Sequence, residues 1–270
     1  MVEFYNNIGR GLSVIAGPCV YEGYEHARSM IHELKNITHK QGVNFIYKTS
    51  FDKANRSSKD SFRGLDFEST MLAWKTLQEE TGVEFLTDVH EQWQCKEVTA
   101  QILQIPAFLC RQTDLLYAAG KTGLPVSVKK GQFLSPLEMK NVIDKLESIG
   151  CSKILLTERG TSFGYNNLVV DFRSIPIMKQ SGYPIVIDCT HSVQEPGGLG
   201  KTSGGDREMA RYIARAGLAV GADVVFMEVH DDPDKAPSDG PNMIRLNNFE
   251  TLLNELKDVW KIRPKKRIGV

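Results

Sequence analysis

The chain has 270 residues, of which 41% are hydrophobic and 24% are charged, values close to the average for globular proteins. Its 33 basic and 33 acidic side chains give a formal net charge of zero, and this balance argues against a broad nucleic-acid-binding surface. The same composition excludes disordered, collagen-like and coiled-coil proteins.

Short apolar runs recur along the chain and predict β-strands. Most of them are continuous rather than alternating, which is typical of strands covered on both faces. Pro106 is expected at the edge or the end of the fourth run, because proline has no N–H group for a sheet ladder. In chain order the runs are residues 12–16, 43–47, 83–87, 102–109, 125–128, 153–157, 184–188 and 223–229.

Amphipathic stretches between these runs predict helices. One of them opens with a Ser-Pro start and a capping-box pair, Ser135 and Glu138. The predicted helices are residues 24–40, 67–80, 135–149, 206–220 and 249–261.

Strand, loop and helix alternate eight times without a linker or a break in composition. The count and the length predict a single (β/α)8 TIM barrel over residues 1–270, with a doubly wound open sheet as the structural alternative. From about residue 261 the chain is basic, and we expect a solvated C-terminal tail there.

The cysteine count and the apolar patterning bear on location. Five cysteines without a CxxC pair indicate free thiols in a reducing compartment. Residues 1–10 lack the apolar segment of a signal peptide, and no apolar run has the length of a membrane span. We therefore expect a soluble, cytoplasmic protein without nucleic-acid or membrane partners.

A charged or metal-ligating side chain follows every predicted strand, and in a barrel these positions meet at one end. A cationic set suits phosphate and carboxylate groups, so it predicts a small substrate with several negative charges, although each cation alone is also compatible with an ordinary surface residue. We expect Lys129 and Arg159 to lie on surface loops. The set consists of Lys48, Lys53, Arg56, Arg111, Lys129 and Arg159.

A second set at the same end combines a thiol, an imidazole and two carboxylates: Cys19, His191, Glu228 and Asp239. Such donors suit Zn²⁺, Fe²⁺ or Mn²⁺. Their long-range spacing is equally compatible with a small core cysteine and a hydrogen-bonded loop histidine. Three other histidines share one predicted helix, and we expect them to face solvent rather than bind metal: His26, His32 and His39.

Gly200-Lys201-Thr202 ends like a phosphate-binding P-loop, but Glu195 stands where that motif requires glycine. We expect residues 195–205 to form a flexible loop over the site instead.

Long motifs now indicate a family. IAGPC, KTSFDKANRSS, IPAFLCRQTDLL, KKGQF, LTERGTSFGYNNLVVDFR, DCTHSVQEPGG and FMEVH followed by SDGPNM resemble the 3-deoxy-D-manno-octulosonate 8-phosphate synthases, over residues 14–246. The related 3-deoxy-D-arabino-heptulosonate 7-phosphate synthases usually carry Lys-Pro-Arg-Thr where this chain has Lys-Ala-Asn-Arg-Ser-Ser.

The resemblance implies condensation of phosphoenolpyruvate with D-arabinose 5-phosphate, in lipopolysaccharide synthesis, by a homotetramer. It implies phosphoenolpyruvate binding by Lys48, Lys53, Lys129, Gln132 and Arg159. It implies sugar-phosphate binding by Asn55, Arg56, Ser57, Asp88 and Arg111, the last reaching from a neighbouring subunit. Members with cysteine at position 19 use a divalent metal, which implies the ligands Cys19, His191, Glu228 and Asp239. The residues expected to take part in catalysis are Lys53, Lys129, His191 and Asp239.

Two alternatives remain open from the residues alone. One is a heptulosonate synthase or another phosphosugar lyase on the same barrel. The other is a non-catalytic phosphosugar-binding protein.

Overall fold

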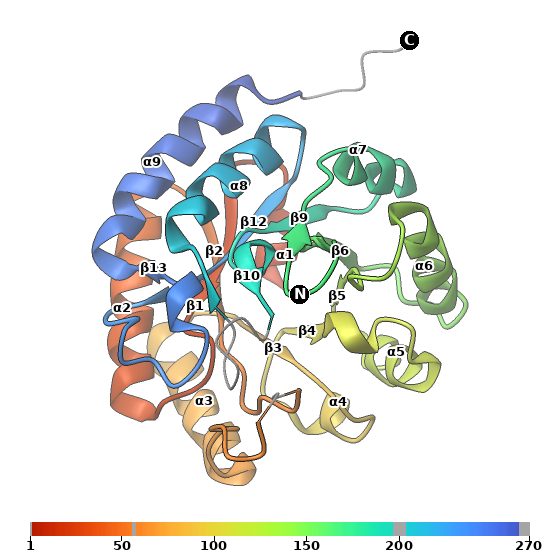
Figure 1. Cartoon of the computed structure of the whole chain (residues 1–270). Coiled ribbons are helices and arrows are strands. Elements are labelled where there is room, and N and C mark those ends of the chain that lie inside the picture. Colours follow the sequence, from red (N-terminus) through yellow and green to blue (C-terminus); the bar gives the residue numbers. More distant parts are fainter. Residues whose placement is uncertain (1, 56–57, 197–203, 265–270) are drawn as a thin grey trace.

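The computed structural model describes residues 2–55, 58–196 and 204–264. Within them, parallel strands close into a barrel that is surrounded by helices (Figure 1). Strand β1 pairs with both β2 and β12, so the sheet has no open edge at this point. The (β/α)8 prediction is confirmed, and the open sheet is excluded. The barrel strands are β1 (Ser13–Gly17), β2 (Asn44–Lys48), β3 (Phe85–Asp88), β4 (Ile102–Ile105), β5 (Val126–Lys129), β6 (Ile154–Glu158), β9 (Ile185–Asp188) and β12 (Val224–His230).

Strand boundaries differ from the predicted ones in an informative way. Lys48, Asp88 and Lys129 are the last residues of their strands rather than the first residues of loops. The predicted strand 102–109 was wrong in its second half: β4 ends at Ile105, and Pro106 accepts the hydrogen bond that opens the 3-10 turn η1 (Ala107–Leu109). Because proline cannot donate to the ladder, the strand ends before it.

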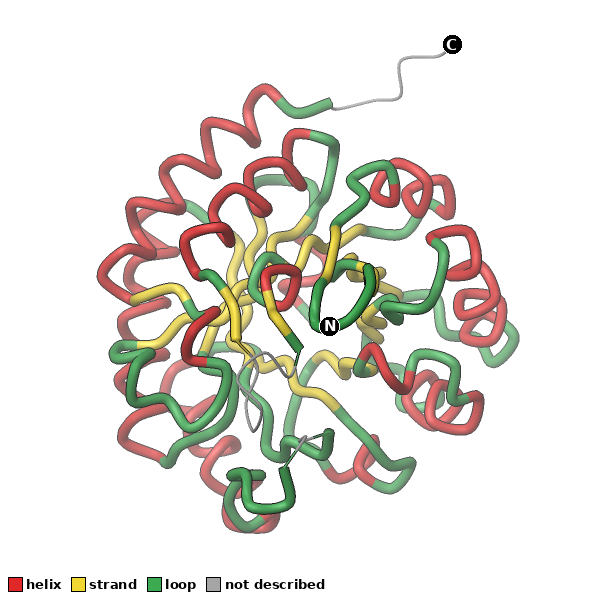
Figure 2. Tube along the Cα trace, viewed as in Figure 1, coloured by secondary structure: helices red, strands yellow, loops and turns green. Residues whose placement is uncertain are grey.

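Helices surround the strands in an outer ring (Figure 2). The five predicted helices are present, the third as a 3-10 turn, η2, followed by α6, with the predicted capping box. They are α2 (Tyr24–Gln41), α3 (Phe67–Thr81), η2 (Pro136–Glu138) with α6 (Met139–Glu147), α8 (Arg207–Ala219) and α9 (Leu246–Ile262).

Shorter elements escaped prediction because each is too short to show a helical or a strand period. They are α1 (Glu3–Asn7), α4 (Gln94–Glu97), α5 (Thr113–Gly120), α7 (Ser174–Met178), η3 (Lys179–Ser181), η4 (His191–Val193), η5 (Gly240–Asn242), β13 (Ile244–Arg245) and two small hairpins, β7 (Thr161–Ser162) with β8 (Leu168–Val169) and β10 (Gln194–Glu195) with β11 (Gly204–Gly205).

Two segments for which the sequence predicted a structure, the loop over the site and the basic tail, lie only partly within the described residues. The loop predicted over the site falls largely on residues 197–203, outside the described residues. The predicted basic tail overlaps the end of α9, and its last residues, 265–270, are also outside them.

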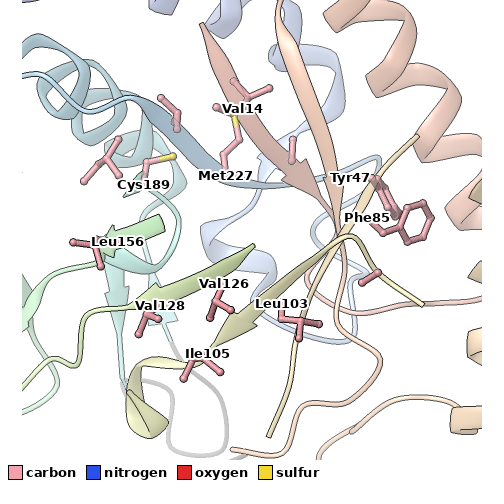
Figure 3. Close-up of a cluster of buried hydrophobic side chains, with 14 of the residues drawn as sticks. Val14, Tyr47, Phe85, Leu103, Ile105, Val126, Val128, Leu156, Cys189 and Met227 are labelled. Carbon is pink, nitrogen blue, oxygen red and sulfur yellow. The ribbon is translucent and has the colours of Figure 1, made fainter. Parts of the chain in front are cut away.

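Apolar side chains fill two layers. One lies between the strands and the helices, where Val14, Leu103 and Val128 belong to a single large cluster (Figure 3). The other lies inside the barrel, where Phe4 of α1 packs against Ile15 and other strand residues. The carboxylate of Glu84 accepts hydrogen bonds from the first backbone N–H groups of α1. The N-terminal end of the barrel is therefore closed and apolar, which leaves the other end for chemistry. None of the described helices combines the length and the apolar character needed to cross a membrane.

Candidate active site

A cavity of about 310 Å³ lies at the C-terminal ends of the barrel strands. Its wall contains most of the residues that the sequence singled out, although they come from distant parts of the chain. The predicted residues that line it are Lys48, Lys53, Asn55, Asp88, Lys129, Gln132, Arg159, His191 and Asp239.

Five predicted site residues are not among those that line this cavity. Two of them, Arg56 and Ser57, lie outside the described residues. Cys19 and Glu228 are fully buried beside the lining residues. A fifth, Arg111, is exposed and borders a separate depression next to Lys145 of α6. The prediction that Arg111 serves a neighbouring subunit is not tested by a single chain.

Lys129 and Arg159 form one wall of the cavity. The expectation that they lie on surface loops was wrong, because Lys129 is 6% and Arg159 5% exposed. Lys129 Nζ lies 2.8 Å from the carboxylate of Asp188 and 4.3 Å from the centre of the Phe226 ring. The Arg159 guanidinium donates to the backbone oxygen of His191 at 3.0 Å. Both cations are therefore held in place by protein contacts before any substrate binds.

Lys48 and Lys53 form the opposite wall. Lys48 Nζ donates to Glu228 Oε1 at 3.2 Å and to the backbone oxygen of Cys19 at 3.1 Å. Lys53 Nζ donates to Ser50 Oγ at 2.9 Å, and Ser50 in turn donates to Asp88. Burial lowers the pKa of Lys53, but the nearby thiol and carboxylates raise it above its ordinary value, so this side chain stays cationic.

The candidate metal ligands meet between these walls. Cys19, Glu228 and Asp239 each place one donor atom within 4.8 Å of the others, and Cys19 Sγ lies 3.1 Å from Asp239 Oδ2. His191 joins them through Nε2, which is 3.7 Å from Glu228 Oε1. The structure thus brings together all four residues that the sequence left as either a metal site or ordinary core and loop residues.

The electrostatics of this group fit a divalent cation. Burial, together with the nearby carboxylates of Asp239 and Glu228, raises the pKa of the Cys19 thiol to about 12. Glu228 Oε2 is buried and has no hydrogen-bond partner among the described residues. A divalent cation would reduce the repulsion between the Cys19 sulfur and the two carboxylates, and it would give Glu228 Oε2 a partner. A thiolate, an imidazole and carboxylates are suitable ligands for such a cation.

Asp239 adopts an unusual backbone conformation. Its φ is +54°, a left-handed value that is uncommon for residues other than glycine. The residue caps the N-terminus of η5, and its backbone oxygen accepts from Asn242 N at 2.9 Å. Non-glycine residues in this conformation cluster at functional sites, where the surrounding structure compensates for the strain.

Asp188 is a functional candidate that sequence reasoning missed. It is fully buried at the end of β9, and its carboxylate contacts both Lys129 and His191. Its Oδ1 also accepts from the backbone N–H of His191 at 2.9 Å. Burial would raise the pKa of Asp188, but the charges of His191 and Lys129 lower it far below its ordinary value. A carboxylate that ends an apolar strand and precedes a candidate ligand by three residues was the available signal.

The other histidines only partly follow expectation. His32 and His39 are exposed, as predicted. His26 does not face solvent: it is half-buried, and its ring packs on His230 with centroids 4.9 Å apart. Periodicity alone placed His26 on an outer face, but the end of β12 covers the first turn of α2.

Comparison with known proteins now identifies the family. The family model described as "DAHP synthetase I family" matches residues 5–263. A protein of Cyanothece sp. is 53% identical over 250 residues, which cover 92% of each chain, and one of Bartonella henselae is 52% identical over 91% of this chain and 89% of its own. A Rhodopseudomonas palustris protein is 52% identical over 99% of this chain and 93% of its own. All three relatives are named 2-dehydro-3-deoxyphosphooctonate aldolase, a second name for the octulosonate phosphate synthases that the motifs resemble. The chain therefore belongs to the DAHP synthetase I family and, within it, to the group of the 2-dehydro-3-deoxyphosphooctonate aldolases.

Proposed function

We propose that this chain condenses phosphoenolpyruvate with D-arabinose 5-phosphate and water, giving 3-deoxy-D-manno-octulosonate 8-phosphate and inorganic phosphate. The observation that carries the proposal is the convergence of Lys48, Lys53, Lys129 and Arg159 on one cavity of a protein without net charge. Two phosphorylated substrates need several cations, and a cavity of about 310 Å³ has the size of a small-molecule site. The names of the relatives support the same reaction.

Phosphoenolpyruvate carries a phosphate and a carboxylate, and we assign their binding to Lys48, Lys53, Lys129, Gln132 and Arg159. Lys129 and Arg159 are fixed by Asp188 and by the backbone of His191, so little side-chain freedom is lost on binding. Gln132 lines the same cavity, and its amide N–H groups are the part of this side chain that can donate to a phosphate or a carboxylate.

Arabinose 5-phosphate is assigned to Asn55, Arg56, Ser57 and Asp88, with Arg111 supplied by a neighbouring subunit. Asn55 lines the cavity from its exposed rim, and Asp88 lies deeper. Asp88 is held by Ser50 and by His90 Nε2 at 3.1 Å. These contacts fix the carboxylate as an acceptor for sugar hydroxyl groups.

In the proposed reaction, C3 of phosphoenolpyruvate attacks the sugar aldehyde, and negative charge develops on the aldehyde oxygen. Lys53 stays protonated and stabilises that charge as a fixed cation. Lys129 orients the phosphate, and Asp188 holds the side chains of Lys129 and His191 in position. The attack leaves C2 cationic, and water adds there. The proton that this water releases balances the negative charge on the former aldehyde oxygen, and the tetrahedral bisphosphate then loses phosphate by C–O cleavage.

We further propose a Zn²⁺, Fe²⁺ or Mn²⁺ ion held by Cys19, His191, Glu228 and Asp239. When bound, such an ion supplies Lewis acidity and a positive charge near the reacting oxygens. The charges of the described residues support it: Lys48, Lys53, Lys129 and Arg159 are matched by four carboxylates, those of Asp88, Asp188, Glu228 and Asp239. A divalent cation would add positive charge to this group, which has to receive two anionic substrates.

A substrate comparison tests the reaction. Phosphate release from phosphoenolpyruvate is expected with arabinose 5-phosphate and to be far slower with erythrose 4-phosphate, because residues 53–58 lack the Lys-Pro-Arg-Thr pattern of the heptulosonate synthases. An equal or reversed kcat/KM would favour the heptulosonate reaction. Ligand binding without phosphate release would favour a binding protein.

Metal removal tests the cation. Chelation is expected to abolish activity, and Zn²⁺, Mn²⁺ or Fe²⁺ to restore it to different degrees, because the thiol must ionise to bind. Cys19→Ala should fold and remain inactive, whereas Cys95→Ala, which removes a buried thiol away from the cavity, should keep its activity. Full activity of the wild type after chelation, with no metal found by elemental analysis, would refute this part of the proposal.

We also propose a homotetramer. Large aromatic side chains are exposed on segments that follow β4, β5 and β6, all at the end of the barrel that holds the cavity: Phe108, Phe133, Phe163 and Tyr165. Covering them in an assembly would remove this apolar surface from water and bring a second chain near the cavity, where Arg111 is needed. Light scattering of the purified protein measures the oligomeric state directly.

A cytoplasmic location and a role in supplying lipopolysaccharide synthesis complete the proposal. All five cysteines are free and buried, which suits a reducing compartment.

A further inference from the structure

A second group of metal-binding side chains lies beside the catalytic group. Glu22, His26 and His230 each place one donor atom within 4.8 Å of the others. His230 follows Glu228 by two residues on β12, and Glu22 follows Cys19 by three residues after β1. None of the three lines the catalytic cavity. Cys19 and Glu22 thus both follow β1, and Glu228 and His230 both lie on β12, while His26 comes from the first turn of α2.

One carboxylate orients both imidazoles. Asp231 Oδ1 lies 3.1 Å from His26 Nε2 and 3.0 Å from His230 Nδ1. When these two nitrogens donate to Asp231, the lone pairs lie on His26 Nδ1 and His230 Nε2. A carboxylate that fixes the tautomer of a ligating histidine in this way is a common outer partner in metal sites.

The two remaining nitrogens are suited to a cation. His26 Nδ1 is buried and has no hydrogen-bond partner among the described residues. His230 Nε2 lies 2.8 Å from Glu22 Oε1, a contact that needs either a proton or a cation between the two atoms. With the proton on Nε2, Nδ1 accepts instead from the backbone N–H of Asp232 at 2.9 Å. A cation at Nε2 displaces this proton, and Nδ1 is then protonated and donates to Asp231.

We propose that Glu22, His26 and His230 form a second divalent-cation site, with Asp231 as the positioning residue for both imidazoles. Two imidazoles and a carboxylate select Zn²⁺, Co²⁺ or Ni²⁺ over Mg²⁺ or Ca²⁺. Glu22 is 21% exposed on its side chain, so water completes the coordination. The bound ion ties the ends of β1 and β12 to α2 and so supports the backbone next to Cys19 and Glu228.

Metal stoichiometry tests this site independently of catalysis. The full-length protein is dialysed against Co²⁺, and bound metal is counted by elemental analysis for four chains: wild type, Cys19→Ala, His26→Gln and the double variant. We expect two, one, one and no ions per chain, respectively. The thiolate-to-metal absorption band should vanish in Cys19→Ala and persist in His26→Gln. If the catalytic metal itself is absent, the expected numbers of Co²⁺ ions per chain are one for the wild type, one for Cys19→Ala, and none for His26→Gln and the double variant. That result would still support the second site.

Matched variants exclude weak binding by any surface histidine. His32→Gln, at an exposed position of the same helix, should keep the wild-type stoichiometry. Glu22→Gln should weaken the second Co²⁺ at least about tenfold, and it gives a second reading if His26→Gln does not fold. The proposal is overturned if His26→Gln binds as much Co²⁺ as the wild type, or if His32→Gln loses an equal amount.

Discussion

Asp188 shows how one buried carboxylate can organise several candidate catalytic residues. It contacts the Lys129 ammonium at 2.8 Å and the His191 ring at 2.9 Å, and it also accepts from the His191 backbone. Because one side chain fixes a cation of the substrate wall and a candidate metal ligand, its loss should affect both. Asp188 opens the DCTHSVQEPGG motif and precedes His191 by three residues, but neither feature shows which side chains it contacts, because those contacts depend on the fold.

Asp188→Asn keeps the shape of the side chain but removes its charge. Leaving the Lys129 ammonium buried without its partner is expected to lower the free energy of unfolding by about 3–5 kcal/mol. Phosphoenolpyruvate and metal affinity should both fall, as measured by calorimetry. Asp223→Asn is the control: Asp223 pairs with Lys179 at the opposite end of the barrel, so this variant should lose stability without losing either affinity. Equal ligand affinity in Asp188→Asn and the wild type would contradict the positioning role.

At the scale of elements, strand ends decide which side chains share the cavity. The eight apolar runs predicted the strands because parallel barrel strands are covered on both faces. The predicted ends were less accurate, since polar residues such as Lys48 and Lys129 close their strands and resemble loop residues in the sequence. Short segments such as α4 and α7 could not be predicted, because tertiary packing rather than periodicity holds them in helical form.

Gly17 illustrates how closely neighbouring strands approach at the site. Its φ is +155°, and a Cβ atom at this position would lie 2.1 Å from the backbone oxygen of Lys48. The Cβ is fixed to the backbone of β1 and the oxygen belongs to the backbone of β2, so no side-chain rotation can relieve the clash. One of the two strands would have to move. Such a movement displaces Cys19, two residues further on, and Lys48 itself.

Gly17→Ala is therefore expected to lower the free energy of unfolding by about 3 kcal/mol and to reduce activity strongly even where the protein is folded. Thermal denaturation and steady-state kinetics below the melting temperature measure the two effects. Gly11→Ala serves as the control, because Gly11 precedes the same strand and a Cβ there meets nothing within 4 Å. Similar behaviour of the two variants would show that the β1–β2 contact does not constrain the site.

For the whole molecule, the barrel separates stability from chemistry along its axis. Apolar side chains around Phe4 and Ile15 fill the interior toward the N-terminal end, and charged side chains occupy the other end. The sequence predicted the charged end, because residues after the strands could be collected by position. It did not predict the apolar closure by α1, since a five-residue helix has no period to detect.

Phe4→Ala tests this separation. Phe4 is 1% exposed, and truncating a buried phenylalanine is expected to cost about 3–5 kcal/mol of unfolding free energy through lost burial and the remaining cavity. Because the site lies at the opposite end of the barrel, kcat and KM should stay within about twofold of the wild type at temperatures where the variant is folded. Leu72→Ala, at a position that is 69% exposed on α3, should change stability by less than about 0.5 kcal/mol. A large loss of kcat in folded Phe4→Ala would mean that the closure of the barrel also shapes the active site.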